Sequence, residues 1–201
     1  MNGAAVELTR LLAREDFAPV YREADRVRRA RVGDVVHLRA ILEFSNHCQR
    51  RCAYCGLNAR NGGASRFRMT PEEMIAAARR AHEAGYRTLV MQSGEDAYFT
   101  PQLLGEIVRQ IARETGMAVT LSCGEMPRAA YAHLKACGAR RYLLKHETSD
   151  ARLYAQLHPG GSLKSRLACL RALGELGYEV GGGFMVGLPG QTLETIADDL
   201  L

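Results

Sequence analysis

The sequence predicts an α/β fold: a parallel βα barrel of the TIM type, with about five of the eight βα units of such a barrel, preceded by N-terminal helices. Two observations predict it. Short apolar segments alternate with longer segments of helical periodicity, which favours a parallel sheet. A polar or glycine-rich cluster also follows each apolar segment, and parallel βα folds build their sites at these strand ends.

The first part of the chain, residues 1–34, is expected to form an N-terminal helical extension. Apolar residues recur at helical spacing between residues 5 and 31, which indicates two helices. The barrel core is expected to occupy residues 35–201, beginning with a buried strand over the apolar run 35–44. These two ranges are the predicted domains.

The rest of the core is expected to alternate between helices and strands. Helices start at proline and capping residues, as in Thr70-Pro71, and end at glycine, as at Gly116. The predicted strands are 87–92, 117–121, 141–144 and 178–186. The predicted helices are 70–85, 100–114, 127–138, 162–176 and the segment from 191 onward. An irregular stretch is expected before residue 162.

The end of the chain lies inside a helical pattern, at Asp198-Asp199-Leu200-Leu201. A complete βα barrel has eight units and ~250 residues. We therefore expect this chain to be truncated, or a fragment of a longer gene product. A complete five-stranded open sheet is the alternative.

Composition is that of an ordinary globular protein, 47% hydrophobic and 24% charged, with a net charge of +5. Arginines gather at residues 22–31, but acids interrupt them, which favours a solvated helix face over a nucleic-acid site. No apolar run reaches the ~18 residues of a membrane span, and the N-terminus has no secretory pattern. We therefore expect a cytoplasmic protein without nucleic-acid or membrane partners.

A cysteine loop with the spacing Cys48-x3-Cys52-x2-Cys55 follows the first predicted strand. Thiolates bind soft metals and clusters. A loop with only three such ligands leaves one coordination position open, as catalytic metal sites do. The alternative is a zinc knuckle completed by His47 or a distant residue. Clustered cysteines also favour metal ligands in a reducing cytosol over a disulfide framework.

The clusters after the other strands share groups suited to one kind of ligand. They are Ser93-Gly94-Glu95-Asp96, Ser122-Cys123-Gly124-Glu125, Lys145-His146-Glu147-Thr148 and Met185-Val186-Gly187-Leu188-Pro189-Gly190. Glycine lets backbone approach a ligand closely, and carboxylates can hold an ammonium or ribose hydroxyls. Arg166, at a helix start, offers a fork for a carboxylate. Around three thiolates, these groups suit an amino-acid-like zwitterion joined to a nucleoside.

Some residues keep more than one interpretation. Glu125 can contact such a ligand or cap the helix that Pro127 opens. His158, before a proline, is expected to mark only a loop. Cys137 and Cys169 lie in helical patterns and are expected to be buried as small hydrophobic residues.

The cysteine loop, with Tyr54 before its last cysteine, resembles the signature of the radical S-adenosylmethionine (SAM) enzymes. In that family three cysteines bind a [4Fe–4S] cluster, SAM chelates the fourth iron, and the reduced cluster cleaves SAM to methionine and a 5′-deoxyadenosyl radical. The resemblance implies cluster ligation by Cys48, Cys52 and Cys55. It also implies a set of cofactor-binding residues, Tyr54, Ser93, Gly94, Glu95, Ser122, Glu147, Arg166 and, near the substrate cavity, Met185.

Longer stretches resemble the HydE family, which matures the H-cluster of FeFe-hydrogenases and belongs with biotin synthase and methylornithine synthase. These stretches are 43–46, 54–57, 92–96, 141–148 and 185–192. The resemblance implies a small-molecule or small iron-complex substrate, an electron donor such as ferredoxin or flavodoxin, and other hydrogenase maturases as partners. The alternatives are a methylornithine synthase-like mutase, biotin synthase-like sulfur insertion, or a non-enzymatic iron–sulfur or zinc module.

Overall fold

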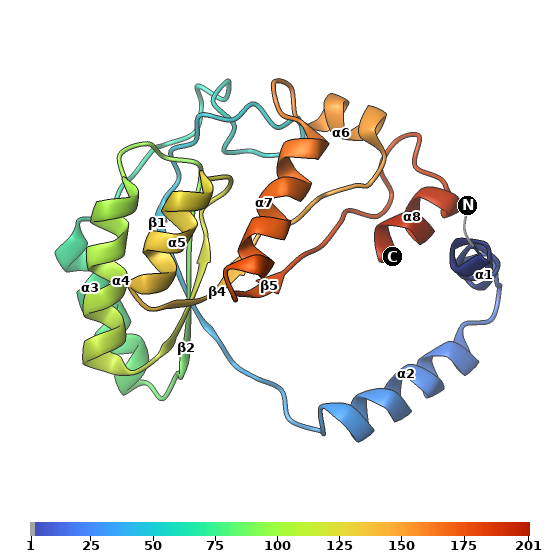
Figure 1. Ribbon diagram of the computed structural model, residues 1–201, viewed down its shortest axis with the longest axis horizontal. Helices are drawn as coiled ribbons and strands as arrows, with labels where there is room; N and C mark the ends of the chain where they lie inside the picture. Colours follow the sequence, from blue (N-terminus) through green and yellow to red (C-terminus); the bar gives the residue numbers. More distant parts are fainter. Residues whose placement is uncertain (1–2) are drawn as a thin grey trace. The chain divides into compact units, whose positions relative to one another are not determined.

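The computed structural model describes residues 3–201 (Figure 1). Its internal contacts divide the chain into two units. The larger unit is Arg39–Phe184, and the smaller combines the chain up to Leu38 with Met185–Leu201. The predicted domain boundary after residue 34 stays a prediction.

The larger unit contains a parallel sheet whose strands lie in chain order. The strands are β1 (Ala40–Ser45), β2 (Thr88–Ser93), β3 (Ala118–Ser122), β4 (Ala139–Leu143) and β5 (Glu179–Gly181). The helices between them are α3 (Pro71–Glu83), α4 (Pro101–Thr115), α5 (Arg128–Ala136), α6 (Ala151–Leu157) and α7 (Leu163–Glu175). Because parallel crossovers are right-handed, sequential strand order places the crossover helices α3, α4, α5 and α7 on one face. In Figure 1, α3, α4, α5 and α7 follow one another along the sheet.

Local sequence sets the helix boundaries much as expected. Thr70 accepts a hydrogen bond from the Glu73 backbone N–H at 3.2 Å, and the Glu73 carboxylate accepts one from the Thr70 N–H at 2.7 Å. Pro71 occupies the first turn of α3. Gly116 ends α4 at φ 65°, a left-handed conformation that glycine adopts without a steric penalty.

Two predicted strands are shorter in the structure. The run 35–44 enters the sheet only at Ala40, where it pairs with Leu89, and Val36 before it is 83% exposed. β2 begins at Thr88, one residue before Leu89, so in this register it has no strand residue opposite Val36. The predicted strand 178–186 is continuous only over β5, which pairs with residues 141–143 of β4. Beyond it, a single parallel bridge joins Phe184 to Glu147.

One helix was not predicted. Helix α6 lies within the stretch expected to be irregular, and it is only seven residues long. Asp150 caps it by accepting a hydrogen bond from the Leu153 backbone N–H at 2.8 Å. Burial of Leu153 and Tyr154 then stabilises a helix too short to show a clear period.

The pleat of the sheet separates the core from the opposite face. Phe44, Met91, Leu121 and Tyr142 are fully buried in the core. On the opposite face the register places Glu43 beside Gln92, and Gln92 beside Ser122. The carboxyl ends of β1, β2 and β3 therefore bring polar side chains to one place above a packed core.

The smaller unit consists of α1 (Gly3–Leu12), α2 (Ala18–Arg31) and α8 (Leu193–Leu200), and α1 packs against α8. The two predicted N-terminal helices are confirmed. On α2 the arginine-rich patch is balanced by ion pairs such as Arg28–Asp25 at 2.8 Å and Arg26–Glu23 at 2.6 Å. None of the helices within residues 3–201 has the length and apolar character needed to cross a membrane.

Candidate functional site

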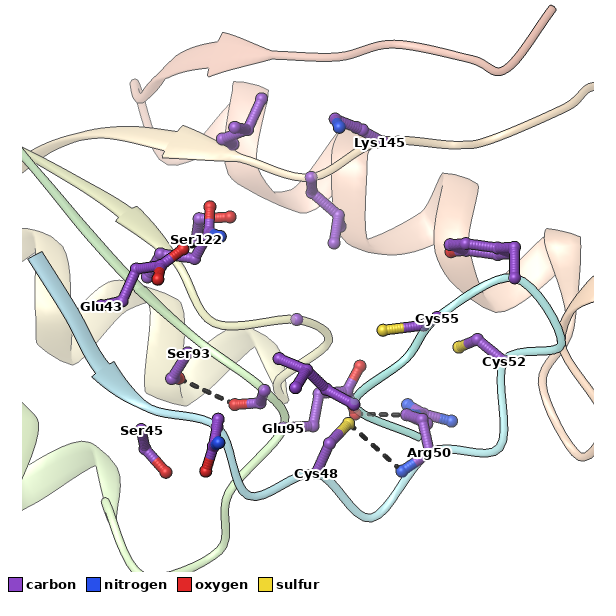
Figure 2. Close-up of a pocket in the computed structure, with 18 of the residues that line it drawn as sticks. Glu43, Ser45, Cys48, Arg50, Cys52, Cys55, Ser93, Glu95, Ser122 and Lys145 are labelled. Carbon is purple, nitrogen blue, oxygen red and sulfur yellow. Dashed lines mark hydrogen bonds and ion pairs between the residues drawn. The ribbon is translucent and has the colours of Figure 1, made fainter. Parts of the chain in front are cut away.

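A cavity of about 420 Å³ lies at the carboxyl ends of β1 to β4 and is bordered by the cysteine loop (Figure 2). The predicted site residues that line it are Cys48, Cys52, Tyr54, Cys55, Ser93, Gly94, Glu95, Ser122, Glu147 and Arg166. The structure thus brings together residues spread over 119 sequence positions, from Cys48 to Arg166. Met185 belongs to the smaller unit, and its predicted contact with the ligand stays a prediction.

Hydrogen bonds from backbone N–H groups and from Arg66 hold the cysteine loop in place. The Gln49 N–H donates to the Glu95 carbonyl at 3.1 Å, and the Ala53 N–H donates to the Leu157 carbonyl at 2.8 Å. The Arg66 guanidinium donates to four carbonyl oxygens on both sides of the loop, including that of Asn46 at 2.6 Å. These contacts fix a loop that has little secondary structure of its own.

The three loop cysteines are free thiols that border the same cavity (Figure 2). Burial, together with the thiols of Cys48 and Cys55, raises the pKa of Cys52. Within residues 3–201, no three Cys, His or acidic side chains converge closely enough to share one metal ion. A cluster in which each thiolate binds its own iron makes no such demand, and soft thiolates around an open cavity fit an iron–sulfur cluster.

Two glycines allow the loop and a carboxylate to pack closely. A Cβ on Gly94 would lie 2.2 Å from the His47 carbonyl oxygen and 2.6 Å from the Cys48 Cβ. A Cβ on Gly124 would lie 2.1 Å from the Glu95 Cγ, and Gly124 also has φ +80°. The sequence predicted that both glycines face a ligand. In the structure the missing side chain of Gly94 leaves space for Cys48, and that of Gly124 leaves space for Glu95.

Beside the thiols, two carboxylates and two guanidiniums form a network. The Arg50 Nε lies 2.5 Å from Glu95 Oε2, and its Nη2 lies 3.6 Å from Glu125 Oε2. The Arg166 Nε lies 3.1 Å from Glu125 Oε1. The Glu125 backbone N–H donates to Glu95 Oε1 at 3.1 Å. The two acids offset the two bases, so the network can hold a zwitterion without adding net charge to the cavity.

A second group of contacts surrounds Cys52. The Nδ1 atom of His158 lies 3.3 Å from the Cys52 sulfur, and its Nε2 atom lies 3.3 Å from the Tyr54 hydroxyl oxygen. Burial, with Arg166 and Arg50 nearby, lowers the pKa of His158 to about 4, so the imidazole is neutral at pH 7. The Tyr54 hydroxyl is also 3.2 Å from Glu147 Oε1, and Glu147 has φ 70°, a strained value for a residue with a side chain.

Asp96 follows the cavity residue Glu95 and holds Ser45, which also lines the cavity, by a hydrogen bond. Its carboxylate accepts hydrogen bonds from the Ser45 hydroxyl at 2.6 Å, from the Arg68 Nε at 2.7 Å and from the Tyr98 backbone N–H at 3.1 Å. Burial alone would raise the pKa of Asp96, but these hydrogen bonds outweigh it and lower the pKa to about 2.

We expect the Asp96→Asn variant to lose about 2 kcal/mol of unfolding free energy at pH 7. The ionised carboxylate is favoured in the folded protein, so its contribution is complete above the unfolded pKa of 3.8 and disappears as the pH falls through about 2. Urea denaturation of the original protein and the variant at pH 7 and pH 3 gives their difference in unfolding free energy at each pH. This difference should be roughly half as large at pH 3 as at pH 7. The same free-energy difference at pH 7 and pH 3 would show that the stabilisation does not come from the negative charge of Asp96.

Sequence reasoning missed part of this site. Arg50, between two of the cysteines, was given no role, and His158 was expected to mark only a loop. Glu125 was left open between a ligand and a helix cap, and it lies in the charged network. The position of Arg50 inside the cysteine motif was a usable signal. His158 had none, because 106 positions separate it from Cys52.

Comparison with known proteins supports one family. The family model of the Radical SAM superfamily matches residues 42–201 of the chain. The chain is 52% identical over 182 residues to the [FeFe] hydrogenase maturase subunit HydE of Thermotoga maritima, covering 90% of this chain and 52% of the relative. It is 30% identical to the 3-methylornithine synthase of Methanosarcina acetivorans, covering 94% of this chain and 54% of that protein. The chain therefore spans about half the length of the curated relatives it matches.

Solved structures agree on the fold. The crystal structure of methylornithine synthase (PylB) superposes with a TM-score of 0.89 at 29% identity, covering 96% of this chain and 58% of that one. The [FeFe]-hydrogenase maturase HydG gives a TM-score of 0.84 at 23% identity, covering 99% of this chain and 50% of that one. The predicted βα barrel architecture, present here in part, is confirmed. The model of this family matches residues 42–201, and the three cysteines of the family signature line one cavity. The chain therefore belongs to the radical SAM superfamily, whose members bind a [4Fe–4S] cluster and SAM.

Proposed function

We propose that the protein reductively cleaves SAM and acts as a HydE-type maturase in assembly of the FeFe-hydrogenase H-cluster. The observation that carries the proposal is the convergence of the three-cysteine loop and the Ser93-Gly94-Glu95 segment on one cavity. The 52% identity to a HydE subunit supports the choice of this branch of the superfamily.

In this proposal Cys48, Cys52 and Cys55 hold the [4Fe–4S] cluster. When bound, the cluster supplies the electron that cleaves SAM into methionine and a 5′-deoxyadenosyl radical. The chain itself orients the reactants and keeps water away from them. The hydrogen-bonded cysteine loop and the packed core supply the rigidity that this positioning requires.

The remaining cavity residues bind SAM. The carboxylate of Glu95 holds the ammonium, together with the hydroxyls of Ser93 and Ser122, and the guanidinium of Arg166 pairs with the carboxylate of SAM. Glu147 accepts hydrogen bonds from the ribose hydroxyls. Tyr54 and Gly94 border the bound nucleoside, and Met185 is proposed to contact it.

The substrate is proposed to be a small iron complex or another small molecule that enters the cavity beyond SAM. Glu43, Gln92 and Lys145 also line the cavity, and the Glu43 carboxylate and the Lys145 ammonium offer both signs of charge to such a substrate. The electron donor is proposed to be a ferredoxin or flavodoxin, and other hydrogenase maturases are proposed partners. The proposed location is the cytoplasm, whose reducing conditions keep clustered cysteines available for iron.

Anaerobic reconstitution tests the proposal. The protein should bind roughly four irons per chain, and SAM with dithionite should then yield 5′-deoxyadenosine. Electron paramagnetic resonance of the reduced protein should change when SAM is added, because SAM takes the open coordination position. A spectrum that SAM leaves unchanged, with no 5′-deoxyadenosine, would favour a non-enzymatic metal-binding module.

A methylornithine synthase-like mutase is the second candidate, supported by the TM-score of 0.89 with PylB. The sequence identities, 52% to HydE and 30% to 3-methylornithine synthase, favour the maturase. Restoration of FeFe-hydrogenase activity in cells lacking their own HydE separates the two. Accumulation of 3-methylornithine instead would establish the mutase.

A further inference from the structure

The fold places His158 against Cys52 of the cysteine loop, a contact that no local pattern predicted. We propose that His158 is a positioning residue that donates a hydrogen bond from Nδ1 to the sulfur of Cys52 and thereby raises the reduction potential of the cluster. The inference rests on the proposed function, because it requires Cys52 to bind the cluster.

The imidazole ring is held in place on several sides. It is 5% exposed and stacks on the Tyr154 ring, with centroids 4.4 Å apart and planes inclined by 19°. The Tyr54 ring meets it edge-on at 5.4 Å. The Leu157 carbonyl accepts a hydrogen bond from the Ala53 N–H at 2.8 Å, which ties the residue before His158 to the residue after Cys52. The 3.3 Å separation between Nδ1 and the sulfur is therefore a fixed feature of the fold.

The chemistry of the sulfur decides which ring nitrogen carries the hydrogen. A thiolate that ligates iron has no hydrogen and can only accept. An unprotonated Nδ1 would direct its lone pair at that negative charge, so the hydrogen belongs on Nδ1. In the neutral ring Nε2 is then an acceptor. The Tyr54 hydroxyl, 3.3 Å away, is the donor that this nitrogen faces.

This arrangement has a consequence for the cavity. The Tyr54 hydroxyl has one hydrogen and lies 3.3 Å from His158 Nε2 and 3.2 Å from Glu147 Oε1. When that hydrogen is directed at His158, Glu147 Oε1 is left to accept from the ligand in the cavity. The tautomer that suits a cluster-bound Cys52 therefore also suits a Glu147 that binds ribose hydroxyls.

A hydrogen bond to a ligating sulfur offsets the negative charge that the cluster gains on reduction, which raises its reduction potential. Two variants separate this effect from packing. In His158→Asn the side-chain amide nitrogen can occupy the place of Nδ1 and still donate to Cys52. In His158→Gln the longer side chain carries its amide toward the place of Nε2, so the donor to Cys52 is lost.

The experiment is an anaerobic redox titration of the reconstituted holoenzyme and of both variants, followed by electron paramagnetic resonance, with iron content measured first. We expect His158→Gln to shift the midpoint potential to a more negative value and His158→Asn to stay close to the original protein. Retention of the cluster by the Asn variant and its loss by the Gln variant would support the same hydrogen bond.

Other outcomes would overturn the proposal. These are an unchanged potential in His158→Gln, equal shifts in the two variants, or loss of the cluster from both, each of which would make His158 a packing residue. If the original protein itself bound no iron, the proposed function would be wrong. If it bound iron but the variants gave one of the outcomes above, only the role of His158 would be wrong.

Discussion

Replacement of Cys52 by alanine is expected to abolish cluster binding and with it the formation of 5′-deoxyadenosine. With one of three thiolates removed, the remaining two sulfurs cannot hold a cubane whose fourth iron must stay open for SAM. The measurements are iron per chain after anaerobic reconstitution and 5′-deoxyadenosine released with dithionite. Both should fall to background.

Cys169→Ala is the matched control for Cys52→Ala. Cys169 lies on α7 and is packed against the core, and its sulfur contacts the Met126 carbonyl at 3.9 Å. Its loss should cost stability but leave iron content and SAM cleavage in place. A Cys52→Ala protein that still cleaves SAM would remove the cluster assignment, and with it the proposed function.

The architecture was predictable from sequence because it depends on local patterns. Apolar segments alternate with capped helices, and each cap, such as Thr70, acts within a few residues of itself. The cysteine loop was predictable for the same reason, since its three thiols lie within eight residues. Strand lengths were not, because a strand ends where its partner ends. Val36 is apolar and β-branched, yet it lies outside the sheet because β2 offers it no partner.

The unpredicted part of the site consists of contacts between distant positions. The sequence supplies Arg50, Glu95 and Glu125 as separate charges, but only the fold shows that Arg50 faces both acids. His158 stands beside Pro159 and two glycines, which indicates a turn, and the short helix before it has no clear period. Its proximity to Cys52 depends on how β4, α6 and the cysteine loop pack, and no local pattern records that packing.

Gly124→Ala is expected to abolish SAM binding while the cluster remains. The new Cβ would lie 2.1 Å from the Glu95 Cγ and 2.4 Å from its Oε1, and both are far inside van der Waals contact. The Glu95 side chain must therefore leave its position beside Arg50 and the Glu125 N–H, and the proposed ammonium site goes with it. Iron content should stay near that of the original protein, and the spectral change on SAM addition should be lost.

The backbone of Gly124 adds a second cost, since φ +80° disfavours a residue with a Cβ by roughly 1–2 kcal/mol. Gly116→Ala separates the two costs. Gly116 has φ +65° with nothing within 4 Å of the added Cβ, so alanine there meets the backbone strain without the clash. We expect Gly116→Ala to lower the unfolding free energy by a similar ~1–2 kcal/mol and to bind SAM normally. If Gly124→Ala also bound SAM normally, the Glu95 carboxylate in its present position could not be the group that holds the ammonium.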